Sequence, residues 1–285
     1  MRTEIIVVTP EMAKKWLLEN TGNRKIRMSH VRFLIDCLQR GEWIKTHQGI
    51  AFDNAGRLLD GQHRLTAISI SGISAEMMVT FDADPDTFAA IDSGLKRSYA
   101  EILRIDKRVA EPLRLAARIV FPGSGRPTPN QLEEVGDTGL AEDLGELIEH
   151  CGSTRKFFTS APMKLAAVMA LWTGSQRSYV FSQYSALARF DVDSMADLAR
   201  VFAKDVNDGK FRSVDQYAVL ARGIRVFDQR RSESKRMRLN GNDVLDSVDM
   251  VRGVLLTSIE KRTTGVDPLF TVNTKRKRVA SSLVS

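Results

Sequence analysis

The segment Asp60-Gly61-Gln62-His63-Arg64 constrains the fold of this chain more than any other part of it. Leu58 and Leu59 precede it, and the apolar residues of 65–68 follow it with helical spacing. The pattern predicts a short strand, a glycine and then a helix that opens with three polar side chains. The first N–H groups of a helix have no partner within it and lie at the positive end of the helix dipole. We therefore expect an anion site, typical of phosphate binding, with Asp60 placed to hold a metal ion.

The residues around this segment alternate between strand and helix patterns. Thr9-Pro10-Glu11 is a typical helix start after the β-branched run 5–8. The turn Asn54-Ala55-Gly56 joins two short runs, 50–53 and 57–60, and predicts a hairpin. The other predicted elements are helices over 29–41, 62–71 and 84–91 and a strand over 76–81. We therefore expect a compact α+β domain over residues 1–98.

After Ser98 only helix patterns follow. Amphipathic spacing predicts helices over 107–120, 129–150, 161–172, 177–190, 194–206 and 214–229. The Pro- and Gly-rich run 121–129 is interpreted as a loop within this helical domain, because it follows the first of these helices. From residue 230 the chain is polar and basic, with one more helix over 243–261 and a flexible end around Lys275–Arg278. The sequence thus predicts three parts: an α+β domain over 1–98, an all-α domain over 99–229 and a basic C-terminal segment over 230–285.

The composition is typical of a globular protein, with 43% hydrophobic and 27% charged residues in a chain of 285. The longest apolar runs, such as 165–172, are too short to span a bilayer, and the N-terminus lacks the apolar region of a signal peptide. Cys37 and Cys151 stand far apart and form no CxxC pair, so both are predicted to be reduced thiols. These features together predict a cytoplasmic protein.

The net charge of +7 is concentrated towards the C-terminus. Residues 230–285 contain 12 Lys or Arg residues against 6 Asp or Glu, which leaves a charge of only +1 for the 229 residues before them. A basic tail on a nearly neutral body predicts a polyanionic partner, with DNA as the first candidate. The alternative is a tail that only improves solubility.

The residues from Gly61 to Ala67 resemble the phosphate-binding motif of the ParB/sulfiredoxin-fold superfamily. ParB-type proteins have Gly-Glu-Arg-Arg followed by the same Leu-x-Ala, sulfiredoxins have Gly-Cys-His-Arg, and free-serine kinases of this fold have Asp-Gly-His-His-Arg. With the segment 46–53, the motif is similar to ParB-like proteins of phages and mobile elements, and the resemblance covers roughly residues 3–98. It implies a ParB/sulfiredoxin-like domain that binds phosphates or a nucleotide. Because Gln62 stands where sulfiredoxins have their catalytic cysteine, a sulfur-reducing activity is not expected.

Each candidate residue of the motif has a functional and a structural interpretation. Arg64 is the strongest candidate, because a guanidinium binds phosphate oxygens in a planar, bidentate way; the alternative is a solvated arginine, although cations are disfavoured at a helix N-terminus. His63 could donate to a phosphate or relay a proton, or be merely structural. Asp60 could hold Mg²⁺ or act as a base, or it could cap the following helix.

Further candidates lie outside the motif. Gln48 precedes the hairpin and could reach the same cleft, and Arg97 stands in a loop of anion-binding type that could complete a phosphate clamp. Asn23, Arg24 and Arg27 lie in the loop between the first two helices, where the resemblance implies substrate or nucleotide contacts, although surface solvation is the favoured interpretation. The predicted catalytic residues are therefore Asp60 and His63, the predicted cofactor-binding residues are Gly61, Gln62, Arg64, Gln48 and Arg97, and the predicted metal ligand is Asp60.

Three functions remain open. The first is a ParB-like protein that binds a nucleoside triphosphate, ATP or CTP, with Mg²⁺ in the cleft and binds DNA through the basic C-terminal segment. The second is a Mg²⁺-dependent phosphotransferase or nuclease in which Asp60 is the base or the metal ligand. The third is a non-catalytic adaptor whose helical region binds another protein. A homodimer is among the assemblies that the first function allows.

Overall fold

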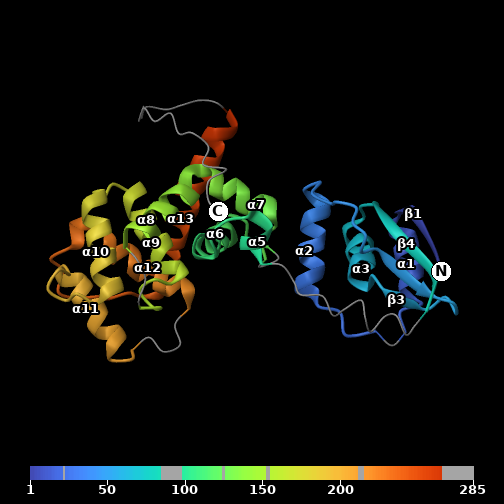
Figure 1. Ribbon diagram of the computed structural model, residues 1–285, viewed down its shortest axis with the longest axis horizontal. Helices are drawn as coiled ribbons and strands as arrows, with labels where there is room; N and C mark the ends of the chain where they lie inside the picture. Colours follow the sequence, from blue (N-terminus) through green and yellow to red (C-terminus); the bar gives the residue numbers. More distant parts are fainter. Residues whose placement is uncertain (22, 85–97, 124–125, 152–154, 211–214, 265–285) are drawn as a thin grey trace, which may run out of the picture.

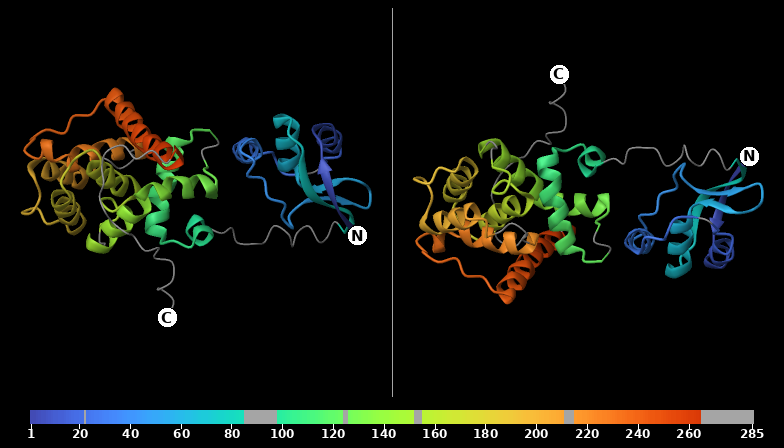
Figure 2. Two further views of the ribbon diagram at one scale, coloured as in Figure 1. Left: turned by 90° about the horizontal axis from the view of Figure 1, so that it is seen from above. Right: turned by 90° about the horizontal axis from the view of Figure 1, so that it is seen from below.

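The computed structural model divides the chain into an N-terminal α+β part and a helical part, which stand side by side along the long axis (Figures 1 and 2). It describes residues 1–285 except 22, 85–97, 124–125, 152–154, 211–214 and 265–285. The predicted α+β class is confirmed, since the described residues form a four-stranded sheet followed by helices alone. The helix expected over 84–91 falls almost entirely outside the described residues.

The N-terminal part is a mixed sheet with three described helices. Its elements are β1 (Arg2–Val8), α1 (Pro10–Leu17), α2 (Met28–Gln39), β2 (Ile50–Asp53), β3 (Leu58–Asp60), α3 (Gln62–Ser71) and β4 (Ala75–Ala83). The strand order is β1-β4-β2-β3, with β1 and β3 antiparallel to their neighbours and β2 parallel to β4. The predicted hairpin and the helix over 62–71 are confirmed, and β1 begins three residues earlier than the predicted strand.

Local signals account for several of these elements. Thr9 caps α1, since its side-chain oxygen accepts a hydrogen bond from the N–H of Met12 at 3.2 Å, and Pro10 occupies the first helical position. Helix α3 packs against both α1 and α2. Val31, Leu65 and Val79 are fully buried in the core that joins these helices to the sheet. This packing fixes the N-terminal end of α3 beside the loop that connects α1 and α2.

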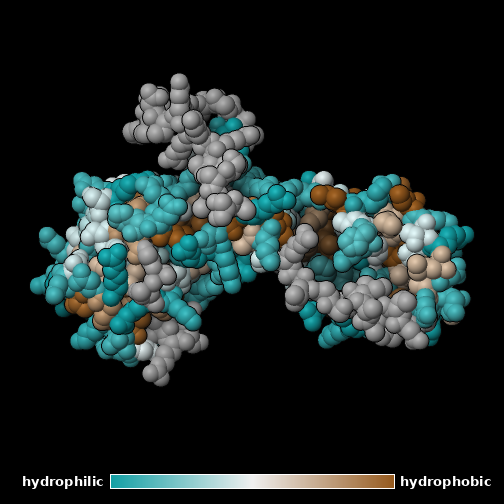
Figure 3. Space-filling view, in the orientation of Figure 1, coloured by the Kyte–Doolittle hydropathy of each residue, from teal (hydrophilic) through white to brown (hydrophobic). Residues whose placement is uncertain are grey.

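The helical part contains a second, separate core. Its helices are α5 (Tyr99–Leu103), α6 (Lys107–Val120), α7 (Pro129–Val135), α8 (Ala141–Cys151), α9 (Ala161–Trp172), α10 (Arg177–Arg189), α11 (Asp197–Asn207), α12 (Gln216–Phe227) and α13 (Gly241–Thr264). Helix α9 is the central helix, with every residue from 162 to 170 buried. Hydrophilic side chains cover most of the visible face of this part (Figure 3).

The helix predicted over 129–150 is not continuous. A π-helical segment, Gly136–Leu140, lies between α7 and α8, and Gly139 within it has a φ of +98°. That backbone conformation is left-handed and is accessible to glycine without strain, so the glycine marks the break. Helix α11 also begins three residues later than predicted, and the short helix α5 was not predicted at all.

Helix α13, which the sequence analysis assigns to the basic C-terminal segment, packs into the core of the helical part. Val251 and Leu255 of α13 are fully buried in the same core as α9, and Arg262 pairs with Asp137 at 2.5 Å. Residues 241–264 therefore belong to the helical part. The basic run Lys275–Arg278 lies outside the described residues.

Both cysteines are free thiols, as predicted, with Cys37 half-buried and Cys151 buried. Burial raises the pKa of Cys37 to about 11, so its thiolate is disfavoured at neutral pH. Among the described residues, no helix combines the length and apolar character needed to cross a membrane.

Candidate functional site

The turn into α3 requires a glycine at position 61. Gly61 has a φ of +102°, and a Cβ atom placed there would lie 2.9 Å from Cγ1 of Ile50 and 3.1 Å from its Cα. Asp60 closes this turn, because its carboxylate accepts a hydrogen bond from the N–H of Gly61 at 2.7 Å. No side chain caps α3, and its first turn contains no acidic residue. The N–H groups of that turn therefore remain suited to an anionic ligand.

The side chain of Gln62 holds a loop against this helix start. Its Oε1 accepts a hydrogen bond from Nδ2 of Asn20 at 3.1 Å, and its Nε2 donates to the carbonyl of Arg24 at 2.8 Å. Asn23 adds a hydrogen bond to Oδ1 of Asn20 at 2.7 Å. Gln62 is only 5% exposed, so its amide serves the fold and only its backbone N–H remains for a ligand. The interpretation of Asn23 as a solvated residue is wrong.

His63 is a buried hydrogen-bond acceptor. Its Nε2 accepts a hydrogen bond from the backbone N–H of Arg27 at 3.0 Å, and its ring stacks edge-on to His30 with centroids 5.3 Å apart. Burial and the positive charges of Arg24, Arg27 and Arg64 lower the pKa of His63 below its ordinary 6.5, against an opposing effect of Asp60. The imidazole is therefore neutral at neutral pH, and its Nε2 is committed to the loop.

The same electrostatic effects identify three arginines around His63, two of which belong to the loop that the sequence analysis considered but interpreted as solvated. Arg24, Arg27 and Arg64 all lie near enough to His63 to disfavour its protonation. Arg24 and Arg27 belong to the loop that Gln62 anchors, whereas Arg64 comes from α3 itself. The signal in the sequence was that Arg24 and Arg27 share one loop with Asn20 and Asn23. These four residues reach α3 only when that loop folds back onto the helix. We call Arg24, Arg27 and Arg64 the arginine cluster.

Arg64 joins the helix to the start of β2. Its Nη1 donates to the carbonyl of Gly49 at 2.9 Å, and its Nη2 lies 3.5 Å from Oε1 of Gln48 and its Nη1 3.7 Å from the carboxylate of Asp60. A Cβ atom on Gly49 would overlap the carbonyl oxygen of Met78, so only glycine fits where β2 begins against β4. The structure thus brings together Gln48, Asp60 and Arg64, as the predicted site requires.

Asp60 is the carboxylate of the site. Its side chain is 38% exposed, and that of Arg64 is 21% exposed. Within the described residues, no group of three or more His, Cys, Asp or Glu residues could hold a metal ion. One carboxylate is nevertheless compatible with Mg²⁺, which proteins often hold through one or two carboxylates together with substrate phosphates. Arg97 lies outside the described residues.

Comparison with known proteins identifies no relative of this chain. No family model matches this chain, and no curated protein or solved structure shows significant similarity to it. The function of the chain therefore has to be inferred from the geometry of the site.

Proposed function

We propose that this chain is a ParB-like, nucleotide-dependent DNA-associated protein, of the kind found in phages and mobile elements. The start of α3 would bind the phosphates of a nucleoside triphosphate, ATP or CTP. The observation that carries this proposal is the arginine cluster beside a helix N-terminus that no side chain caps. Asp60, 3.7 Å from Arg64, offsets part of the positive charge at this helix start, and an anionic ligand would offset more of it, because the helix dipole is positive at the same end.

Each residue then has a distinct task in binding. The N–H groups at the start of α3 donate to phosphate oxygens, and Gly61 lets the backbone approach them closely. Arg64 supplies charge from α3, and Arg24 and Arg27 supply it from the loop before α2. Asp60 would hold Mg²⁺, which neutralises phosphate charge. His63 orients the loop through the N–H of Arg27 and needs no proton transfer for this role.

The basic C-terminal segment supports the association with DNA. Arg231, Lys235, Arg236 and Arg238 are exposed on the connection between α12 and α13. Arg231 is weakly paired with Asp228, at 3.6 Å. Exposed Lys and Arg side chains neutralise DNA phosphates and release counterions, which makes such binding strong at low salt.

Isothermal titration calorimetry with ATP, CTP and ADP, with and without Mg²⁺, tests the nucleotide site. We expect wild-type protein to bind a triphosphate. Arg64→Ala, which removes one charged donor, and Arg24→Ala/Arg27→Ala, which removes two, should each lose on the order of tenfold to a hundredfold in affinity. Arg189→Ala is the matched control, since Arg189 is an exposed arginine of α10 in the other core. Binding that is equal in all four proteins would refute the site.

A Mg²⁺-dependent phosphotransferase or nuclease is the second candidate. It is favoured by the exposed carboxylate of Asp60 beside the proposed phosphate position. Phosphate release or DNA cleavage that disappears in Asp60→Asn, while nucleotide affinity is retained, would favour this function over the first. Absence of any nucleotide binding would instead favour a non-catalytic adaptor.

A further inference from the structure

An open cavity of about 440 Å³ lies in the helical part, between α5 and α6, and the proposed nucleotide site does not use it. The residues that give it its chemistry are Tyr99, Lys107, Glu111, Arg114, Arg118 and Arg126. Four of these six side chains are cationic and one is acidic. The cavity is therefore strongly basic, although the first 229 residues carry a charge of only +1 in total.

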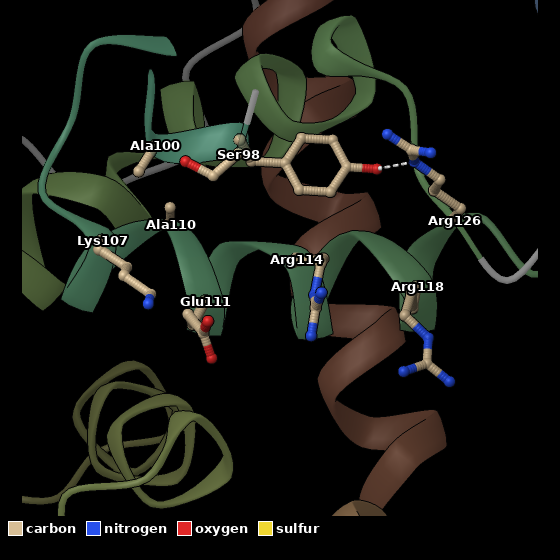
Figure 4. A pocket seen from close by; sticks show the side chains of 9 residues that line it. Ser98, Ala100, Lys107, Ala110, Glu111, Arg114, Arg118 and Arg126 are labelled. Carbon is tan, nitrogen blue, oxygen red and sulfur yellow. Dashed lines mark hydrogen bonds between the residues drawn. The ribbon is translucent and has the colours of Figure 1, made fainter. Parts of the chain in front are cut away.

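Three of the cations form a row along one helix. Lys107, Arg114 and Arg118 lie on α6 at positions separated by seven and four residues, which places them on one face. Figure 4 shows their side chains and that of Glu111 pointing to the same side of the helix. The opposite face holds residues such as Leu113 and Ala116, which are buried in the core. We call Lys107, Arg114 and Arg118 the basic row.

Ion pairs do not neutralise the charges of the basic row within the described part of the chain. None of its three side chains takes part in an ion pair there, whereas the nearby Arg108 is paired with Asp106. Glu111 is the acidic residue of the cavity lining. Cations gathered on one surface without partners repel one another, so an anionic ligand would relieve this repulsion.

The length of the basic row indicates what kind of anionic ligand could contact all three of its side chains. Eleven residues of helix separate Lys107 from Arg118, which corresponds to roughly 16 Å at 1.5 Å per residue. A single phosphate or carboxylate can contact only neighbouring side chains over such a distance. A nucleic-acid strand presents a charge about every 3.4 Å along its axis and can contact the whole row.

The environment of Tyr99 favours a duplex over a single-stranded nucleic acid as the ligand. Single strands are bound largely by stacking of bases on aromatic rings. Tyr99 is the aromatic residue of the lining, but its ring is half-buried against the helical core, and its hydroxyl accepts a hydrogen bond from Nε of Arg126 at 3.3 Å (Figure 4). A lining rich in charge, whose aromatic ring packs into the core, suits the backbone of a duplex.

We propose that the basic row and the α5–α6 cavity bind the sugar–phosphate backbone of duplex DNA, in addition to the C-terminal segment. This inference rests on the proposed association with DNA but is independent of the nucleotide site. It places a DNA contact on an ordered helix of the second core.

Fluorescence anisotropy of a labelled 20-base-pair duplex, titrated with full-length protein at several salt concentrations, tests the proposal. We expect Arg114→Gln/Arg118→Gln to weaken binding roughly tenfold and to reduce the salt slope by about 1.8, since each lost phosphate contact contributes about 0.9. Lys14→Gln/Lys15→Gln removes the same charge from exposed positions of α1 and should leave both values unchanged. Glu111→Gln should tighten binding severalfold, a gain that impaired folding cannot produce.

The outcomes separate this inference from the proposed function. If Arg114→Gln/Arg118→Gln binds like wild type while neutralising Lys275–Arg278 abolishes binding, the basic row is refuted and the C-terminal contact stands. Tighter binding of single-stranded DNA or RNA than of the duplex would refute the duplex assignment. A wild-type protein that binds no DNA refutes both DNA contacts, whereas the calorimetric titration of nucleotides decides the α3 site by itself.

Discussion

The side-chain ammonium of Lys164 donates a hydrogen bond to the backbone carbonyl of Arg108 at 3.2 Å. Arg108 lies four residues before Pro112, inside α6. Because proline has no N–H, that carbonyl has no helical partner, and Lys164 from α9 supplies the missing donor. Lys164 is 8% exposed, which makes it one of the few charged side chains buried in the described structure. A buried charge in the second core thus compensates for a proline in the helix that carries the basic row.

A double-mutant cycle tests this compensation. Lys164→Met removes the donor, and Pro112→Ala restores a backbone N–H four residues after Arg108. We expect Lys164→Met to be less destabilising in the Pro112→Ala background than in wild type, by about 1 kcal/mol, because the carbonyl then keeps a partner. Urea denaturation of the four proteins measures the coupling. Additive effects of the two substitutions would contradict it.

The burial of Lys164 also predicts a stability change at alkaline pH. Burial, followed by the charge of Arg108, lowers the pKa of Lys164 from the ordinary 10.5. The unfolded chain therefore binds this proton more tightly than the folded one, and stability rises as the pH rises through the folded pKa towards 10.5. Below the folded pKa the penalty is fully present. The free energy of unfolding of wild type, relative to Lys164→Met, should increase from neutral to alkaline pH; a flat difference would contradict the prediction.

The lowered pKa of His63 predicts a change in stability at acidic pH. Its pKa is lowered below 6.5, first by burial and then by the arginine cluster. Folding is therefore opposed by protonation, and stability is lost as the pH falls through 6.5 towards the folded pKa. His63→Gln keeps an acceptor for the N–H of Arg27 and should remove this loss. Urea denaturation at about pH 5.5 and 7.5 measures the effect. A bound phosphate group should make the loss in wild type smaller, because it offsets the positive charge around the imidazole.

Two glycines of α3 form a matched pair for the backbone of the site. Gly61 precedes the helix and Gly72 follows it, and both have positive φ, at +102° and +72°. A Cβ atom meets Ile50 at the first and nothing within 4 Å at the second. Gly61→Ala should therefore lower the free energy of unfolding by about 1 kcal/mol or more beyond the effect of Gly72→Ala. Thermal unfolding measures the difference, and equal costs would show that contact with Ile50 is unimportant.

The sequence by itself determined the elements whose causes are local. The cap of Thr9 and Pro10, the turn ending at Gly56 and the strand–glycine–helix segment around Gly61 depend on residues only a few positions apart. Such signals can be read without knowing what the element packs against. They were enough to predict the α+β class, the hairpin and α3, and to draw attention to Asp60 and Arg64.

The tertiary structure alone decided how distant segments meet. Arg24 and Arg27 lie near Arg64 because Gln62 and His63 hold their loop, and Lys164 meets Arg108 from a position 56 residues further along the chain. Helix α13 lies in the segment that is polar and basic in sequence, yet Val251 and Leu255 place it in the core. These contacts follow from burial and packing between elements, which leave no periodic or local trace in the chain. The segment at Gly61 predicted that an anion could bind, and the folded loop supplied the charges that would hold it.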